Sequence, residues 1–139
     1  MPGRQTHTYL DRIMFGKSYW KLHKVIDFPV FLYGRKHREH FHDYVSLICI
    51  AKMNYPDDPV ACDAACLHSL IDNFCTARPD WKKFLAEKAK NYYKKMRQSK
   101  KENKFNRKIK LSHELEKLVR DLKKQIEAKR LYDQFYGLR

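Results

Sequence analysis

The fold is indicated most clearly by residues 58–74, which read DPVACDAACLHSLIDNF. Asp58 is a good N-cap residue, and Pro59 suits the first position of a helix. The apolar residues that follow favour a helix, which the break at residues 76–79 brings to an end. The same reasoning predicts an all-α fold, with further helices near residues 6–15, 18–27, 36–53 and 79–99 and from Ser112 onward, an apolar connector at 28–34 and a turn at 100–110.

Composition predicts a folded chain with a packed core. The 139 residues are 43% hydrophobic and 14% aromatic, which is too apolar for a disordered protein. No stretch approaches the roughly 20 apolar residues of a membrane-spanning helix, and no signal peptide is recognisable. We therefore expect a cytoplasmic protein with free thiols and no membrane span.

The net charge of +14 is concentrated in the second half of the chain. Residues 1–80 carry 10 Lys/Arg and 9 Asp/Glu, whereas residues 81–139 carry 20 and 7. This contrast predicts a compact helical His/Asp domain over residues 1–78, followed by a basic helical arm over residues 79–139.

Two narrow apolar stripes run through the basic half at helical spacing. They suit an antiparallel hairpin or a coiled coil, and the second stripe is a candidate seam for an oligomer. Their residues are Trp81, Leu85, Lys88, Tyr92 and Met96, then Leu111, Leu115, Leu118, Leu122 and Ile126.

Three segments share the pattern His-x-x-x-Asp, which places an imidazole and a carboxylate on one face of a helix. Such a pair can ligate a cation, or the carboxylate can orient the imidazole by accepting its N–H. One pair alone is most often a surface hydrogen bond. Three pairs, with a further His/Asp-rich segment at residues 37–43, predict a metal site instead. The pairs are His7 and Asp11, His23 and Asp27, and His68 and Asp72.

Mixed His and Asp donors suit zinc first, with manganese, iron and nickel as alternatives. One or more divalent cations held this way promote phosphoester hydrolysis. Arg38, beside His37, can neutralise a substrate phosphate, and a helix-surface arginine is the equally weighted alternative. Arg38 and Asp43 are therefore the candidate catalytic side chains.

At these residues the sequence resembles the YdjM-like family of membrane-bound, metal-dependent hydrolases. Thr6-His7 matches the opening motif of that family, residues 37–43 follow its His-Arg-x-x-Thr-His-Ser motif, and residues 65–72 follow its His-x-x-x-Asp helix. The resemblance implies a hydrolase whose metal ligands are His7, His37, His42, His68 and Asp72. It leaves Asp11, His23, Asp27 and Asp43 as further ligands or supporting groups.

The chain also departs from that family. Phe41 and Asp43 stand where the family has Thr and Ser, the basic half lies outside the resemblance, and the membrane-spanning helices are missing. The zinc-dependent phospholipase C and nuclease group is similar at a greater distance, and an HD phosphohydrolase fits the ligand order less well. Cys62 and Cys66 form a weaker metal motif, because small cysteines usually pack between helices.

The basic half can follow a phosphate backbone, with salt-sensitive and mostly sequence-independent affinity. Tyr92, Tyr93 and Phe105 lie among the basic residues and can stack on unpaired bases, although Tyr92 also fits the helical seam. An acidic membrane surface or an acidic protein is the alternative partner. The candidate nucleic-acid-binding residues are Lys94, Lys95, Arg97, Lys100, Lys101, Lys104, Arg107, Lys108 and Lys110.

Two functions follow from these patterns. The first is a metal-dependent hydrolase of phosphoesters, whose basic arm recruits nucleic acid or another polyanion. The second is a non-enzymatic nucleic-acid-binding module, in which a metal or the His–Asp pairs only stabilise the small domain. An open coordination position distinguishes them, because catalytic sites keep one and structural sites are closed.

Overall fold

The computed structural model describes residues 3–28, 43–102 and 109–139, except for the side chains of residues 99–102. Within these ranges the chain is all-helical, which confirms the predicted fold class. The helices are α1 (Arg4–Phe15), α2 (Trp20–Ile26), α4 (Tyr44–Asn54), α5 (Val60–Ala77), α6 (Pro79–Glu102) and α7 (His113–Tyr136).

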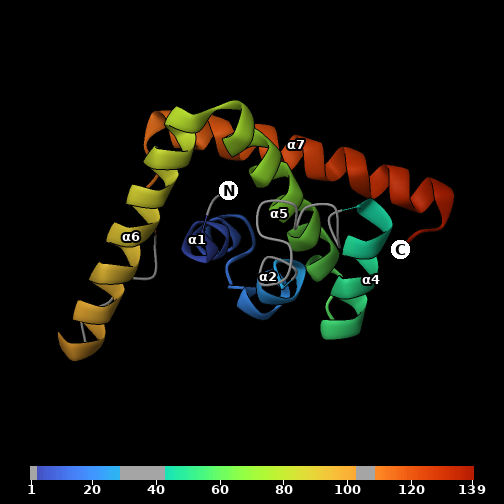
Figure 1. Ribbon diagram of the computed structural model, residues 1–139, viewed down its shortest axis with the longest axis horizontal. Coiled ribbons are helices and arrows are strands. Elements are labelled where there is room, and N and C mark those ends of the chain that lie inside the picture. Colours follow the sequence, from blue (N-terminus) through green and yellow to red (C-terminus); the bar gives the residue numbers. More distant parts are fainter. Residues whose placement is uncertain (1–2, 29–42, 103–108) are drawn as a thin grey trace.

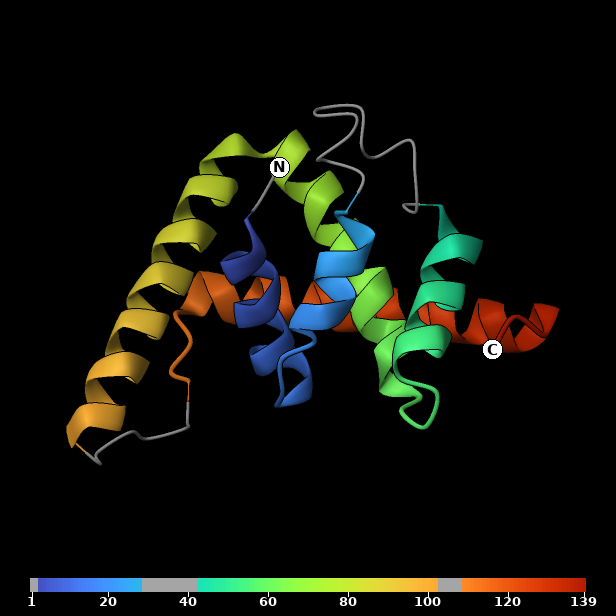
Figure 2. The ribbon, with the colours of Figure 1, turned by 60° about the horizontal axis from the view of Figure 1, so that its bottom comes forward.

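Helix α5 is the centre of the fold and contacts each of the other described helices. Residues 61–68 are buried without interruption, as in a helix that is covered on all sides. Helices α1, α2 and α4 pack along α5, and α7 runs across α1 and α5 (Figures 1 and 2). Residues 58–74, which indicate the fold most clearly in the sequence, thus form most of the central helix α5.

Most helix ends follow local sequence signals. The Asp58 carboxylate accepts the Val60 N–H at 3.0 Å and the Ser112 hydroxyl accepts the Leu115 N–H at 3.4 Å. Gly16 closes α1 in the left-handed region, at φ 78°. These capping residues account for the agreement between the predicted and observed boundaries at these ends. The helix expected over residues 36–53 instead begins at Tyr44, because Asp43 is its N-cap and has an extended backbone.

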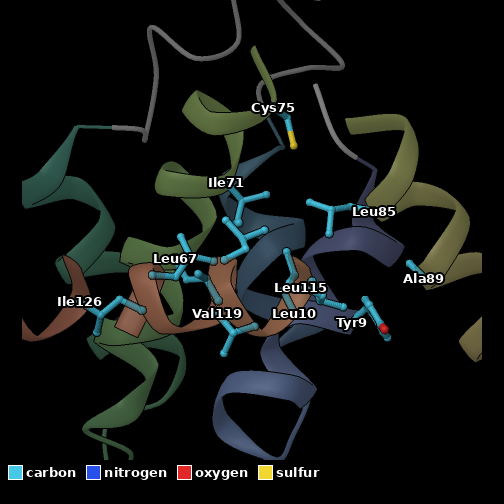
Figure 3. Close-up of a cluster of buried hydrophobic side chains, with 12 residues drawn as sticks. Tyr9, Leu10, Leu67, Ile71, Cys75, Leu85, Ala89, Leu115, Val119 and Ile126 are labelled. Carbon is cyan, nitrogen blue, oxygen red and sulfur yellow. The ribbon is translucent and has the colours of Figure 1, made fainter. Parts of the chain in front are cut away.

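One apolar core joins the neutral and basic halves of the chain (Figure 3). Leu10 of α1 and Ile71 of α5 meet Leu85 of α6 and Leu115 of α7 in this cluster. The charge boundary near residue 80 is therefore not a break in packing. A second apolar cluster joins α2, α4 and α5.

The two basic helices differ from the expected hairpin. Helices α6 and α7 each pack on α1 and α5, and their described parts make no close backbone contact with each other. The stripe expected as an oligomer seam is buried inside the single chain, where α7 covers apolar surface of α1 and α5. Packing on α1 and α5 buries this additional apolar surface, which explains why α6 and α7 pack on the core helices and not on each other.

None of the described helices is both long and apolar enough to cross a membrane.

Candidate metal centre

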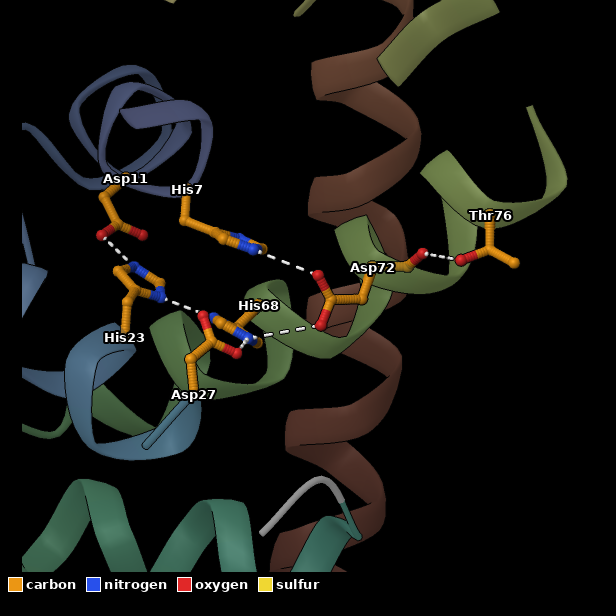
Figure 4. Close-up of polar contacts among 7 residues, drawn as sticks. All are labelled: His7, Asp11, His23, Asp27, His68, Asp72 and Thr76. Atoms are coloured by element: carbon orange, nitrogen blue, oxygen red, sulfur yellow. Dashed lines mark hydrogen bonds and ion pairs between the residues drawn. The ribbon is translucent and has the colours of Figure 1, made fainter. Parts of the chain in front are cut away.

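Three helices bring the His-x-x-x-Asp segments together at one buried point, which we call the His/Asp cluster (Figure 4). Each helix supplies a histidine and, four residues later, an aspartate. The members are His7 and Asp11 from α1, His23 and Asp27 from α2 and its C-terminal cap, and His68 and Asp72 from α5.

His7 and His23 each contact an aspartate of another helix, as His68 also does. His7 Nε2 lies 3.1 Å from Asp72 Oδ1, a contact from α1 to α5. His23 Nε2 lies 2.5 Å from Asp11 Oδ2, a contact from α2 to α1. The same Asp11 oxygen accepts the backbone N–H of Tyr19 at 3.0 Å. The carboxylates therefore orient the imidazole rings and tie the three helices together.

His68 connects these contacts to each other. Its Nε2 lies 3.2 Å from Asp27 Oδ1 of α2 and 3.3 Å from Asp72 Oδ2 of its own helix. Its Nδ1 lies 2.8 Å from His23 Nδ1. The three helices thus exchange partners in a ring, in which each histidine reaches the aspartate of the next helix. The His68–Asp72 contact is also of the i, i+4 kind that the spacing predicts.

The cluster is almost completely shielded from solvent. His7, His23 and His68 are at most 1% exposed, and the Asp27 side chain is the most accessible member at 14%. Within the described part of the chain, no hydrogen-bond partner reaches His7 Nδ1 or Asp11 Oδ1. Buried polar atoms almost always have a partner, so these two atoms are available to a bound group.

Burial and charge set the protonation of the imidazoles. Burial, followed by the neighbouring His68, lowers the pKa of His7 to about 3, so this ring is neutral at pH 7. Burial also lowers the pKa of His68, but its contacts with Asp27 and Asp72 outweigh that effect and raise it overall. A neutral His7 with its Nε2–H at Asp72 presents an unprotonated Nδ1, which is the form that binds a metal.

The donor set fits a divalent cation. His7, His23 and His68 form one group of mutually close donor atoms, and Asp27, His68 and Asp72 form another. Asp11 and Asp72 are buried carboxylates, and a cation beside them would offset the cost of burying them. The His/Asp cluster therefore has the residue types, proximity and charge to hold a metal ion.

Of the 37–43 segment, only Asp43 lies within the described residues. His37, Arg38 and His42 lie outside the described residues. Asp43 is exposed, and its carboxylate accepts the Ser46 N–H at 3.1 Å as the N-cap of α4. This capping role is one that the sequence reasoning missed, although an aspartate before an apolar helix is the usual signal for it.

The candidate nucleic-acid-binding residues are only partly described. Lys94, Lys95 and Arg97 are exposed on α6, and Lys110 is exposed ahead of α7. The remaining members lie in the last turn of α6, where side chains are not described, or beyond the described residues: Lys100, Lys101, Lys104, Arg107 and Lys108.

The aromatic residues of α6 pack against α1. The Tyr92 ring lies 5.3 Å from the ring of Tyr9, and the Tyr93 hydroxyl donates to Thr8 Oγ1 at 2.7 Å. Both tyrosines are half-buried, as the helical-seam interpretation of Tyr92 predicts. Phe105 lies outside the described residues.

The cysteines behave as packing residues. Cys62 and Cys66 are free and buried in α5, and burial raises the pKa of Cys66 to about 11. Burial also raises the pKa of Cys62. Both thiols are therefore protonated at neutral pH, whereas a metal ligand must be a thiolate.

A second buried polar cluster, formed around Asp63, Asp133 and Arg139, was not predicted from the sequence. The Arg139 guanidinium donates to Asp63 of α5 at 2.5 Å and to Asp133 of α7. Arg130 also donates to Asp63 at 2.5 Å, and the Tyr44 hydroxyl donates to Asp133. The sequence signal was an aspartate within the apolar stretch at residues 61–68, because such a carboxylate requires a partner.

Comparison with protein families, curated proteins and solved structures found no match for this chain. The geometry of the His/Asp cluster therefore provides the principal support for a function.

Proposed function

We propose that the chain is a metal-dependent hydrolase of phosphoesters and that the His/Asp cluster binds its divalent cation, with zinc the first choice and manganese, iron and nickel the alternatives. The observation that carries the proposal is the exchange of His and Asp partners among three helices around unpartnered donor atoms. In a purely structural set of His–Asp pairs, most buried polar atoms have a partner.

The side chains have distinct roles in this proposal. Asp11 orients His23 through its Nε2, so that its Nδ1 faces His68 Nδ1 at 2.8 Å. His7 is held by Asp72 in the same way. Asp27 lies at the most accessible edge, where a substrate would approach. A divalent cation in the cluster supplies Lewis acidity for the activation of water and charge neutralisation at a phosphoryl group.

The resemblance to YdjM-like hydrolases supports the same proposal. Two of its three motifs, at Thr6-His7 and at residues 65–72, supply His7, His68 and Asp72 to the cluster. His23 and Asp27, which that family's motifs do not include, join them in the structure.

We also propose that the basic helices recruit a polyanion, with nucleic acid as the first choice. Exposed Lys83, Lys90, Lys94 and Arg97 on α6 support this role. Neutralising several phosphates would make the affinity fall steeply with salt concentration.

The free thiols of the described cysteines support a cytoplasmic location.

A non-enzymatic binding module is the second candidate function. The near-complete burial of the histidines favours it, because structural metal sites are closed. In that case the cation would contribute folding free energy, and the exposed lysines of α6 would carry the whole function.

The test is metal content and phosphoesterase activity of protein purified without an affinity tag. We expect at least one transition-metal ion per chain in the wild type and in His113→Gln, an exposed histidine that serves as the control. We expect His68→Gln to lose the metal while circular dichroism shows that its helices remain. Hydrolysis of bis-p-nitrophenyl phosphate should disappear with a chelator and return with the metal.

Other outcomes separate the two candidate functions. Metal binding without hydrolysis, together with salt-dependent binding to single-stranded DNA or RNA, would replace the enzyme with the binding module. Folded wild type that contains no metal and takes up neither zinc nor manganese would overturn both metal-based proposals.

A further inference from the structure

We propose that the His/Asp cluster holds two cations and that the imidazole of His68 bridges them. This inference rests on the proposed metal binding and deepens it. It assigns each side chain of the cluster to one of two positions and identifies the position at which substrate would bind.

The donor atoms fall into two groups. One group consists of the histidines His7, His23 and His68, and the other of Asp27, His68 and Asp72. The donor atoms within each group lie within 4.8 Å of one another. Only His68 belongs to both groups, so it is where two neighbouring cation positions would meet.

The two nitrogens of His68 face different partners. Nδ1 lies 2.8 Å from His23 Nδ1, on the histidine side of the cluster. Nε2 lies 3.2 Å from Asp27 Oδ1 and 3.3 Å from Asp72 Oδ2, on the carboxylate side. An imidazole that has lost both N–H protons can bind one cation at each nitrogen. This orientation is the one that a bridging ring requires.

The two positions differ in ligand chemistry. The His7, His23 and His68 position is rich in nitrogen, which suits zinc or copper, and the unpartnered Nδ1 of His7 belongs there. The Asp27, His68 and Asp72 position is rich in oxygen, which manganese or magnesium also accepts. Asp27 is the most accessible member of the cluster, so the oxygen-rich position is the one at which a phosphoester oxygen would bind.

Metal stoichiometry tests the inference without relying on activity. Chelator-treated protein would be titrated calorimetrically with zinc chloride, and bound zinc measured by elemental analysis. We expect two zinc ions per chain in the wild type and in His113→Gln, and one each in Asp27→Asn and His7→Gln. The two single-site variants keep the measurement informative if His68→Gln does not fold.

Copper tests whether His68 is shared. Two Cu²⁺ ions bridged by an imidazolate couple magnetically, so the fully loaded wild type should lose most of its electron paramagnetic resonance signal. Asp27→Asn, loaded with one Cu²⁺ ion, should recover the full signal of an isolated ion.

Each alternative result has a separate meaning. One zinc ion per chain in the wild type would overturn the two-cation site and leave the proposed hydrolase intact. Two ions with uncoupled copper signals would overturn the shared His68. No bound metal would overturn the proposed function together with this inference.

Discussion

At the scale of single residues, the pKa values of two stacked, equally buried imidazoles are shifted in opposite directions. The rings of His7 and His68 lie 3.9 Å apart, yet burial lowers the pKa of His7 while the carboxylates around His68 raise its pKa. His7 contacts one carboxylate, whereas His68 contacts both Asp27 and Asp72. The number of carboxylates, rather than burial alone, decides which ring accepts a proton.

The pKa of His7 predicts acid sensitivity of the metal-free protein. Its pKa is about 3 in the folded chain and 6.5 when unperturbed, so its contribution to stability is complete above pH 6.5 and is lost as the pH falls toward 3. The free energy of unfolding should fall by up to about 1.4 kcal/mol per pH unit in that window. Urea denaturation at several pH values should show a shallower fall for His7→Gln.

His113→Gln is the control variant, because His113 is exposed and lies on α7, outside the His/Asp cluster. His68 acts with the opposite sign: its raised pKa gives a contribution that is complete below pH 6.5 and is lost as the pH rises through the folded value. Identical acid slopes for wild type and His7→Gln would show that His7 is not buried in its neutral form.

At the scale of elements, the end of α1 depends on one backbone conformation. Gly16 has a φ of 78°, and a Cβ added there would meet no atom within 4 Å. Gly16→Ala should therefore lower the free energy of unfolding by about 1 kcal/mol through backbone strain alone. Gly3→Ala is the matched control, because Gly3 has an ordinary φ of −74° and equal space around it. Equal losses in chemical denaturation would contradict the left-handed end of α1.

At the scale of the whole molecule, the Asp63–Arg139–Asp133 cluster joins the end of α7 to α5. Asp63 and Asp133 are at most 2% exposed, so removing their shared cation leaves buried negative charge. Arg139→Met should lower the free energy of unfolding by about 3 kcal/mol. Arg130→Met should lower it by less than about 1 kcal/mol, because Arg130 is 47% exposed and screened by solvent. Similar losses of unfolding free energy in Arg139→Met and Arg130→Met would show that Arg139 does not contribute more than Arg130.

Much of the fold could be predicted because its signals are local. Asp58, Ser112 and Gly16 set helix ends within a few residues of themselves. The three His-x-x-x-Asp segments were recognisable because the helical repeat alone places such residues on one face. The sequence therefore determined the all-α class and most helix boundaries, and its candidate ligands include the six residues of the His/Asp cluster beside His37 and His42.

Only the tertiary structure decided how these parts combine. The partner exchange among His7, His23 and His68 depends on how α1, α2 and α5 cross, and no local pattern contains that geometry. Local patterns also do not show that α6 and α7 pack on the core and not on each other, because that arrangement depends on how the helices are placed in space. An apolar stripe specifies that a helix face will be buried, but the partner is selected by the total surface that the assembled chain removes from water.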